Sequence, residues 1–307
     1  MNMTKQLKTT RKVGIKKSFH RISPFYAVMF FILLLLCLSL IIPFCWGLLT
    51  SFKDPLDYTA NVLAVPKTWK FLNYSESLKN LTAKVRWGSG SVTFNLLTMV
   101  IFSLIYAVGG AVIQAVCCAL VAYAVAKFSH FRISKILYVI VIVTMILPIV
   151  GAVPSEVKML KALGLYNTPG VLILKANFLG TYFLVFHAFF CGLPKDFFEA
   201  AEIDGAGNGT ILFRIVVPMA KSVLFTVIVL NFLGNWNDYN ITLVYAPSYP
   251  TLAYGLYVFN NSNNPIIADT PHKMAGAFVV FIPVFVFFCI FSDKLLGENL
   301  TLGGVKE

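Results

Sequence analysis

The chain has 307 residues, of which 58% are hydrophobic and 12% are charged, and its formal net charge is +12. Soluble globular chains carry roughly 25% charged residues, so this composition excludes an ordinary water-soluble protein and indicates one that lies largely in lipid. The surplus Lys and Arg flank apolar runs, as the positive-inside rule describes. They form no basic stripe of the kind that nucleic-acid-binding proteins carry, so we expect no nucleic-acid partner.

A basic segment opens the chain. Residues 1–24 hold seven Lys and Arg and no acidic residue, and an apolar run over residues 25–49 follows. The apolar core of a cleaved signal peptide is only about 7–15 residues long. We therefore interpret this longer run as a retained first membrane span.

Five further apolar runs follow, separated by polar segments that include a long loop over residues 51–91. Each run approaches the roughly 20 residues that a helix needs to cross a bilayer core, and helices satisfy their own backbone hydrogen bonds in lipid. The sequence predicts an all-α integral membrane protein with about six transmembrane helices in one domain, residues 25–291, and a tail over residues 292–307. The further predicted spans are residues 99–126, 136–153, 171–191, 222–246 and 274–291.

The distribution of Lys and Arg predicts the orientation. With the amino terminus inside, the inner segments hold 15 of these residues and the outer loops hold nine. Six of those nine lie in the long loop over residues 51–91, and long loops carry less weight in the rule. We therefore expect both termini and the polar stretch over residues 194–221 to be cytoplasmic.

The polar stretch between the fourth and fifth predicted spans has a recognisable order. Residues 194–218 read PKDFFEAAEIDGAGNGTILFRIVVP. The apolar periodicity of its first part predicts a short helix, and the three glycines that begin at Gly205 predict a turn. The apolar segment after them predicts a second helix that leads into the membrane. Asn208 or Thr210 is expected to cap the second helix.

The first short helix has the features of a docking surface. Phe197, Phe198 and Ala201 fall at helical spacing and give one apolar face, and the small Ala200 lets another protein approach closely. The alternative is an amphipathic helix that rests on lipid headgroups. Acidic residues disfavour that alternative, because the cytoplasmic leaflet is itself anionic. They are Glu199, Glu202 and Asp204.

This loop resembles the signature of the permease subunits of bacterial ABC importers, in which E-A-A is followed after three residues by Gly and after nine more by I-x-L-P. Val217 stands where the signature has Leu. The segment Trp236-Asn237-Asp238 and the tail Gly303-Gly304-Val305-Lys306 are similar to the sugar-uptake, maltose-type branch. The matching positions of the loop are Glu199, Ala200, Ala201, Gly205, Ile215 and Pro218.

The resemblance implies a permease subunit of an ATP-driven, binding-protein-dependent importer of a sugar or oligosaccharide in the bacterial inner membrane. It implies a second permease subunit, two ATP-binding subunits and an extracytoplasmic solute-binding protein as partners. The loop would dock into the ATPase and couple its motion to alternating access. The residues to which the resemblance gives this role are Phe197, Phe198, Glu199, Ala200, Ala201, Asp204, Gly205, Ile215 and Pro218.

Sequence motifs for nucleotide binding, metal binding and catalysis are missing. The dipeptide Gly-Lys never occurs, which excludes the phosphate-binding pattern G-x-x-x-x-G-K-[ST]. The six cysteines lie in or beside apolar runs and lack the spacing of a metal site. We therefore expect no catalytic residue, metal or cofactor in this chain, with ATP bound by a partner subunit.

Polar residues inside the predicted spans are costly in lipid and normally face a cavity or a neighbouring helix. Asn231, Asn235, Asp238 and Thr242 are spaced by four, three and four residues, which predicts one polar face of the fifth helix. This face would line a sugar path, or it would form hydrogen bonds to the partner permease. For any single residue we favour the bond to the partner permease. His187 is expected to pack in the core. The possible solute path comprises Gln114, Asn177, Tyr182, Asn231, Asn235, Trp236 and Asp238.

Two other functions stay open at this point. One is a permease for a different solute, such as an oligopeptide or a polyol. The other is a secondary transporter driven by an ion gradient, which needs ionisable residues deep in the spans. The chain offers few of these, namely Lys175, His187 and Asp238, and an ion-coupled transporter would leave the polar loop unexplained.

The orientation can be tested with two reporter fusions. A reporter active only in the cytoplasm should be active when fused at Glu307, and one active only outside should be active when inserted within residues 55–85, because the Lys and Arg excess holds the termini inside. Silence of both reporters in expressed, membrane-inserted protein would contradict the six-span topology.

Overall fold

The computed structural model describes residues 24–147, 151–174, 180–194 and 196–296. The predicted terminal segments, residues 1–24 and 292–307, lie largely outside these ranges. The chain divides into two compact units, residues 1–47 and 48–307. The first unit contains most of α1 (Pro24–Ser51), a 28-residue apolar helix that matches the first predicted span.

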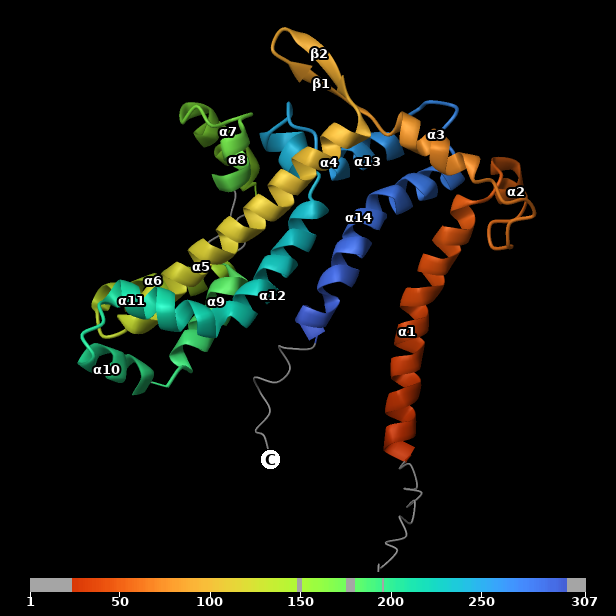
Figure 1. Ribbon diagram of the computed structural model, residues 1–307. Coiled ribbons are helices and arrows are strands. Elements are labelled where there is room, and N and C mark those ends of the chain that lie inside the picture. Colours follow the sequence, from red (N-terminus) through yellow and green to blue (C-terminus); the bar gives the residue numbers. More distant parts are fainter. Residues whose placement is uncertain (1–23, 148–150, 175–179, 195, 297–307) are drawn as a thin grey trace, which may run out of the picture. The chain divides into compact units, whose positions relative to one another are not determined.

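Three long apolar helical runs form the frame of the second unit (Figure 1). Within the described residues, these runs and α1 are the four helices long and apolar enough to cross a membrane. They overlap the first, second, fifth and sixth predicted spans. The three runs are α4 (Leu96–Leu104) with π-helix η1 (Ile105–Gly109) and α5 (Gly110–Lys127), α11 (Asn208–Ile211) with π-helix η2 (Leu212–Val216) and α12 (Val217–Trp236), and α14 (Thr270–Leu296).

The third predicted span is shorter than expected. Helix α6 (Arg132–Ile146) has 15 residues and ends with Leu147 in an extended conformation. The next residue in the sequence is proline, and the residue before a proline is biased away from helical conformation. The remaining predicted residues lie partly outside the described ranges, and α7 (Ala152–Ala162) follows as a separate helix.

The fourth predicted span is wrong as a single helix. Helix α8 (Pro169–Leu174) is separate from α9 (Thr181–Cys191), and Gly180 before α9 has an extended backbone. Helix α9 has only 11 residues, about half the length that crosses a bilayer core.

The fifth predicted span is shifted toward the amino terminus. The continuous helix begins at Asn208 and ends at Trp236, ten residues before the predicted end at residue 246. The Asp238 carboxylate accepts a hydrogen bond from the backbone N–H of Asn240 at 2.9 Å. Such side-chain bonds to the local backbone compete with helix continuation, and the π-helix η3 (Ile241–Tyr245) follows.

The long loop over residues 51–91 is more ordered than predicted and corrects the all-α assignment. It holds α2 (Pro55–Ala60), α3 (Leu72–Asn80) and an antiparallel hairpin of β1 (Ala83–Trp87) and β2 (Gly90–Phe94). Buried Ala83 and Val85 alternate with exposed Lys84 and Arg86. A Gly-Ser pair, with Gly88 at φ +58°, joins the strands. Alternation around such a two-residue turn is a hairpin signal that the sequence already carried.

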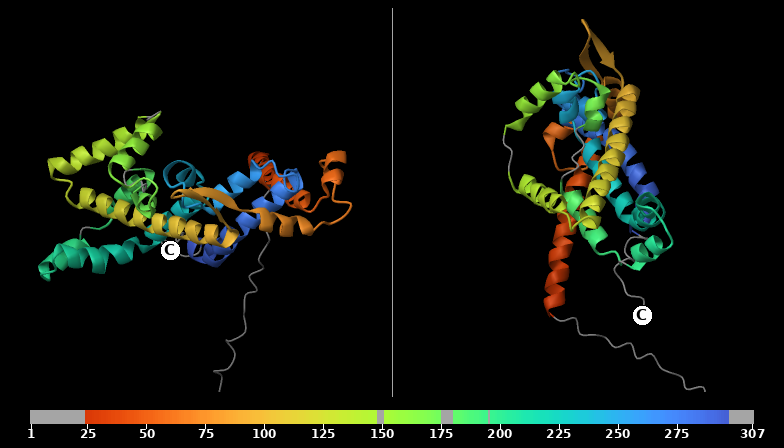
Figure 2. Two further views of the ribbon diagram at one scale, coloured as in Figure 1. Left: turned by 90° about the horizontal axis from the view of Figure 1, so that it is seen from above. Right: turned by 90° about the vertical axis from the view of Figure 1, so that its left-hand side faces the viewer.

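Helices α9 and α12 pack on α5 in the main core of the second unit (Figure 2). Helix α5 presents the small residues Ala115, Cys118 and Ala122, which are fully buried. Small side chains let neighbouring backbones approach closely in membrane proteins. The aromatic rings of Phe183 and Phe186 from α9 fill this contact and are also fully buried.

A second core joins α14 to α13 (Leu252–Asn260). A tight contact lies at Gly276, where an added Cβ would be 2.7 Å from Cε1 of Phe259. Phe259 is only 1% exposed, so its ring has little room to move. A hydrogen bond from the Leu252 N–H to Ser103 Oγ, 2.6 Å long, ties α13 to α4.

The replacement Gly276→Ala should destabilise the protein, because the new methyl group overpacks the fitted contact with Phe259, at a cost of about 1–3 kcal/mol. Gly234→Ala is the matched control, since an added Cβ there meets nothing within 4 Å and alanine is favoured in helices. Thermal unfolding in detergent should show a lower midpoint for Gly276→Ala alone. Equal midpoints for the two variants would contradict this packing.

Candidate functional site

The polar stretch after α9 begins with the short helix α10 (Asp196–Ile203). The backbone N–H of Gly205 donates to the Glu202 carbonyl at 3.0 Å, and that of Ala206 donates to the Ala201 carbonyl at 2.9 Å. Gly205 has φ +78°, the left-handed conformation that commonly ends a helix. The structure therefore has the predicted helix stop at Gly205.

The second helix of the stretch starts without the predicted side-chain cap. Gly207 occupies the N-cap position and makes no side-chain hydrogen bond, since glycine has none to offer. The Asn208 side chain instead accepts a hydrogen bond from Lys127 Nζ at 2.8 Å. The prediction that Asn208 or Thr210 caps this helix is therefore wrong.

Helix α11 runs without interruption through η2 into α12. Pro218 lies in the first turn of α12 but inside this continuous run, where its missing N–H removes one hydrogen bond of a regular helix. The π-helical segment directly before it is a local adjustment of the hydrogen-bond ladder. Half-buried Ile215 lies in this segment, and Pro218 is exposed. The signature positions Ile215 and Pro218 thus lie where the polar loop becomes a long apolar helix.

None of the eight residues of α10, all of which the structure describes, is buried. Phe197 is 52% exposed. The predicted apolar docking face is therefore only partly exposed, because Phe198 and Ala201 are partly buried against the core of α5, α9 and α12. Other exposed residues of those given the coupling role in this loop are Glu199, Ala200, Asp204 and Gly205.

A hollow of about 490 Å³ lies between α10 and the end of α5. Lys127 and Glu199 contribute charged groups to its wall, and Phe198 contributes an aromatic ring. Further lining residues are Tyr123, His130 and Cys191.

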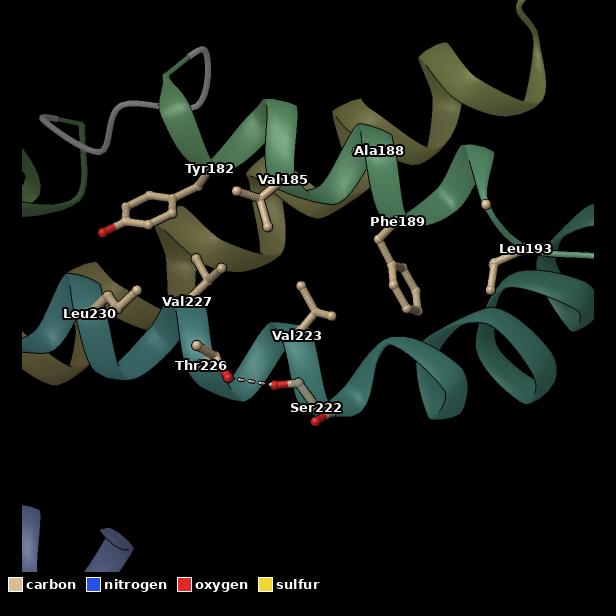
Figure 3. Close-up of a pocket in the computed structure, with 11 residues that line it drawn as sticks. Tyr182, Val185, Ala188, Phe189, Leu193, Ser222, Val223, Thr226, Val227 and Leu230 are labelled. Carbon is tan, nitrogen blue, oxygen red and sulfur yellow. Dashed lines mark hydrogen bonds between the residues drawn. The ribbon is translucent and has the colours of Figure 1, made fainter. Parts of the chain in front are cut away.

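A larger hollow of about 570 Å³ separates parts of α9 and α12 (Figure 3). Val185 and Phe189 of α9 point toward Val223 of α12, and the lining is mainly apolar. Tyr182 contributes the phenol group and Thr226 a hydroxyl, which donates to the Ser222 carbonyl at 3.0 Å. Of the predicted solute-path residues, Tyr182 lies here.

The predicted polar face of the fifth span is only partly present. Asn231 and Asn235 lie on α12, but the helix ends at Trp236, so Asp238 and Thr242 lie beyond it. The Thr242 hydroxyl is buried and donates to the carbonyl of Tyr249 at 3.1 Å. The single four-residue face is therefore wrong, because a periodicity argument fails where the helix stops.

The predicted path residues have different surroundings. Asn231 and Trp236 are buried, and their side-chain N–H donors, Nδ2 and Nε1, have no hydrogen-bond partner among the described residues. Asp238 Oδ2 accepts a hydrogen bond from the Tyr106 hydroxyl at 2.9 Å. Gln114 and Asn235 are half-buried. Asn177 lies outside the described residues.

His187 packs among aromatic rings. Its ring centroid lies 4.7 Å from that of Tyr138 and 5.8 Å from that of Phe183. This arrangement agrees with the predicted packing role.

Two contacts escaped the sequence interpretation. Tyr106 with Asp238, and Lys127 with Asn208, join residues that are 132 and 81 positions apart. Neither pair belongs to a local pattern, so no spacing signal could have found them.

Comparisons with known proteins agree on one class. The family model for the binding-protein-dependent transport system inner membrane component matches residues 118–297. The diacetylchitobiose uptake system permease protein NgcG of Streptomyces coelicolor is 27% identical over 278 residues, covering 89% of this chain and 87% of that protein. The galactooligosaccharides transport system permease protein GanQ of Bacillus subtilis is 28% identical, covering 93% and 98% respectively.

A solved structure has the same fold. It is a crystal structure of a bacterial ABC transporter involved in the import of the acidic polysaccharide alginate, with a TM-score of 0.70. The match covers 90% of this chain and 98% of the other at 22% sequence identity. At that identity, the likeness establishes the fold alone.

Proposed function

We propose a specific transport role for this chain on one premise: the chain belongs to the binding-protein-dependent transport system inner membrane component family. It is a membrane-embedded permease subunit of a binding-protein-dependent importer. We propose that its solute is a sugar or oligosaccharide. The names of relatives that match nearly full length, NgcG for diacetylchitobiose and GanQ for galactooligosaccharides, support this solute class.

The observation that carries the proposed mechanism is the continuity of the polar loop with a long apolar helix. The second helix of the loop and α12 form one helical run of 29 residues, Asn208–Trp236. A helical run transmits displacement along its axis, whereas a flexible loop would absorb it. Movement imposed on α10 would reach the run through the short turn at Gly205 and Gly207.

In this mechanism α10 is the docking element for a separate ATPase subunit. Its exposed face combines the aromatic ring of Phe197, the carboxylate of Glu199 and the small Ala200. An exposed aromatic beside a small residue suits a fitted protein contact, in which few residues supply most of the binding energy. The loop and both termini face the cytoplasm, and ATP closes the partner subunits to drive alternating access.

The proposed complex contains this chain, a second permease subunit, two ATP-binding subunits and an extracytoplasmic solute-binding protein. Asn231 and Trp236 are the strongest candidates for contacts inside the membrane. Buried donors without a partner are costly, and sugar hydroxyls or polar groups of the second permease would satisfy them.

The partner requirement predicts a clear biochemical contrast. The purified chain alone should hydrolyse no ATP, because its sequence lacks the phosphate-binding pattern. Co-expressed with a second permease and ATP-binding subunits, it should co-purify with them and hydrolyse ATP, with stimulation by sugar-loaded binding protein. Uptake by this chain alone, driven by a proton or sodium gradient, would instead favour a secondary transporter.

Loop variants should separate docking from solute passage. Ala200→Trp places a bulky ring on the exposed docking face and should prevent close approach, at a cost of about 1–3 kcal/mol of binding. Gly205→Ser should strain the turn, because φ +78° disfavours side chains, by roughly 1–3 kcal/mol. Both variants should insert normally but lose the ATPase or fail to couple hydrolysis to uptake. The measurements are ATPase co-purification and uptake of labelled sugar.

Two controls accompany these variants. Gly207→Ser changes a glycine two residues away that has φ −71° and open space around it, and serine is a good N-cap, so coupling should persist. Asn231→Ala should leave ATPase docking intact and alter solute passage at most. Wild-type docking and uptake in both Ala200→Trp and Gly205→Ser would remove the coupling role of this loop.

A further inference from the structure

We infer that Lys127, the last residue of α5, is a positioning residue that holds α10 and the start of the α11–α12 helix in one arrangement, so that displacement of α10 reaches the membrane core. This inference rests on the coupling role proposed for α10. It assigns that role a residue outside the loop itself.

Lys127 contacts both helices of the loop at once. Its Nζ donates to Asn208 Oδ1 at 2.8 Å, at the first residue of α11. It also lies 3.5 Å from a carboxylate oxygen of Glu202 in α10 and 6.0 Å from the ring centroid of Phe198. One ammonium group therefore links α5, α10 and α11.

The exposures of these groups rank the contacts. The Lys127 side chain is 17% exposed, whereas that of Glu202 is 57% exposed. Ion pairs in contact with solvent contribute little, so the short bond to Asn208 is the stronger link. A charged donor at this distance makes a charge-assisted hydrogen bond, which is stronger than a neutral one. The Glu202 contact chiefly fixes which turn of α10 faces α5.

Apolar packing alone holds α10 weakly. None of its residues, each within the described part of the chain, is buried, and only Phe198 and Ala201 touch the main core. The hollow of about 490 Å³ between α10 and α5 leaves room for α10 to shift. A polar link across the edge of such a hollow sets the helix position more strongly than it would in a packed interface.

The position of this lysine also has a simpler explanation, which assigns it no role in coupling. A cation in the last turn of a helix is favoured by the helix dipole, and Lys127 occupies that place in α5. The dipole accounts for a positive charge, but it does not require the side chain to reach Asn208 and Glu202. Variants of Lys127 that keep, remove or reverse its charge, the last with and without an exchanged charge at Glu202, distinguish the positioning role from the dipole effect.

The test uses the full complex with its ATPase and binding protein, and it measures solute transported per ATP hydrolysed. Lys127→Met should still assemble with the ATPase, but this ratio should fall roughly tenfold, the size expected for a lost hydrogen bond to a charged group. Lys127→Arg keeps the charge and the donors and should retain most of the ratio. Lys135→Met, an exposed lysine in the first turn of α6, is the matched control and should behave as wild type.

A charge exchange covers the case in which Lys127→Met fails to assemble. Lys127→Glu places two carboxylates together and should uncouple the complex. Adding Glu202→Lys should restore at least part of the ratio, because it removes the repulsion and the Asn208 side chain can turn its amide N–H toward the new carboxylate. A wild-type ratio in Lys127→Met, or no recovery in the exchanged pair, would overturn the inference. Gly205→Ser in the same assay separates the two proposals. If it too couples normally, the role of the loop fails, whereas an effect of Gly205→Ser without one of Lys127→Met removes only the positioning role.

Discussion

The packing of α9 and α12 against α5 is the constraint on which the rest of the second unit depends. The polar loop leaves the end of α9 and returns into the helix that contains α12, so this packing fixes both ends of the loop. Close approach is possible because α5 presents small residues where α9 presents phenylalanine rings. The loop can therefore be largely exposed and still keep a defined position relative to the membrane core.

Membrane burial explains which parts of the fold were predictable. Long apolar runs leave the backbone one way to satisfy its hydrogen bonds, so four predicted spans overlap long apolar helices. The interruptions depend on single residues that a hydropathy window averages away. The backbone of Gly180 is extended directly before α9, and Asp238 binds backbone N–H groups just beyond α12. The β-hairpin had a local sequence signal, namely alternating residues around a Gly-Ser pair. It was missed because a polar loop between two membrane spans is not expected to contain strands.

In the candidate site too, local features were predictable from the sequence and contacts between distant residues were not. The turn at Gly205 was predictable because the end of a helix depends on neighbouring residues in the sequence, and a glycine after an apolar-periodic segment indicates such an end. The partial burial of Phe198 and Ala201 was not, because helical spacing identifies an apolar face without saying what covers it. The Lys127 contact depends on three elements meeting in space. A single sequence gives no measure of such distances.

One irregular turn of a long helix falls where a polar contact crosses to another helical segment. Tyr106 lies in η1, in the middle of a run of 32 residues, and its hydroxyl reaches Asp238 just beyond the end of α12. The other carboxylate oxygen of Asp238 accepts backbone N–H groups at the start of η3. A π-helical turn inserts an extra residue per turn and re-aims the side chains after it, and such turns are frequent at functional sites. One carboxylate thus links two irregular segments at the end of α12 opposite the polar loop, which places a polar junction at each end of the same long helix.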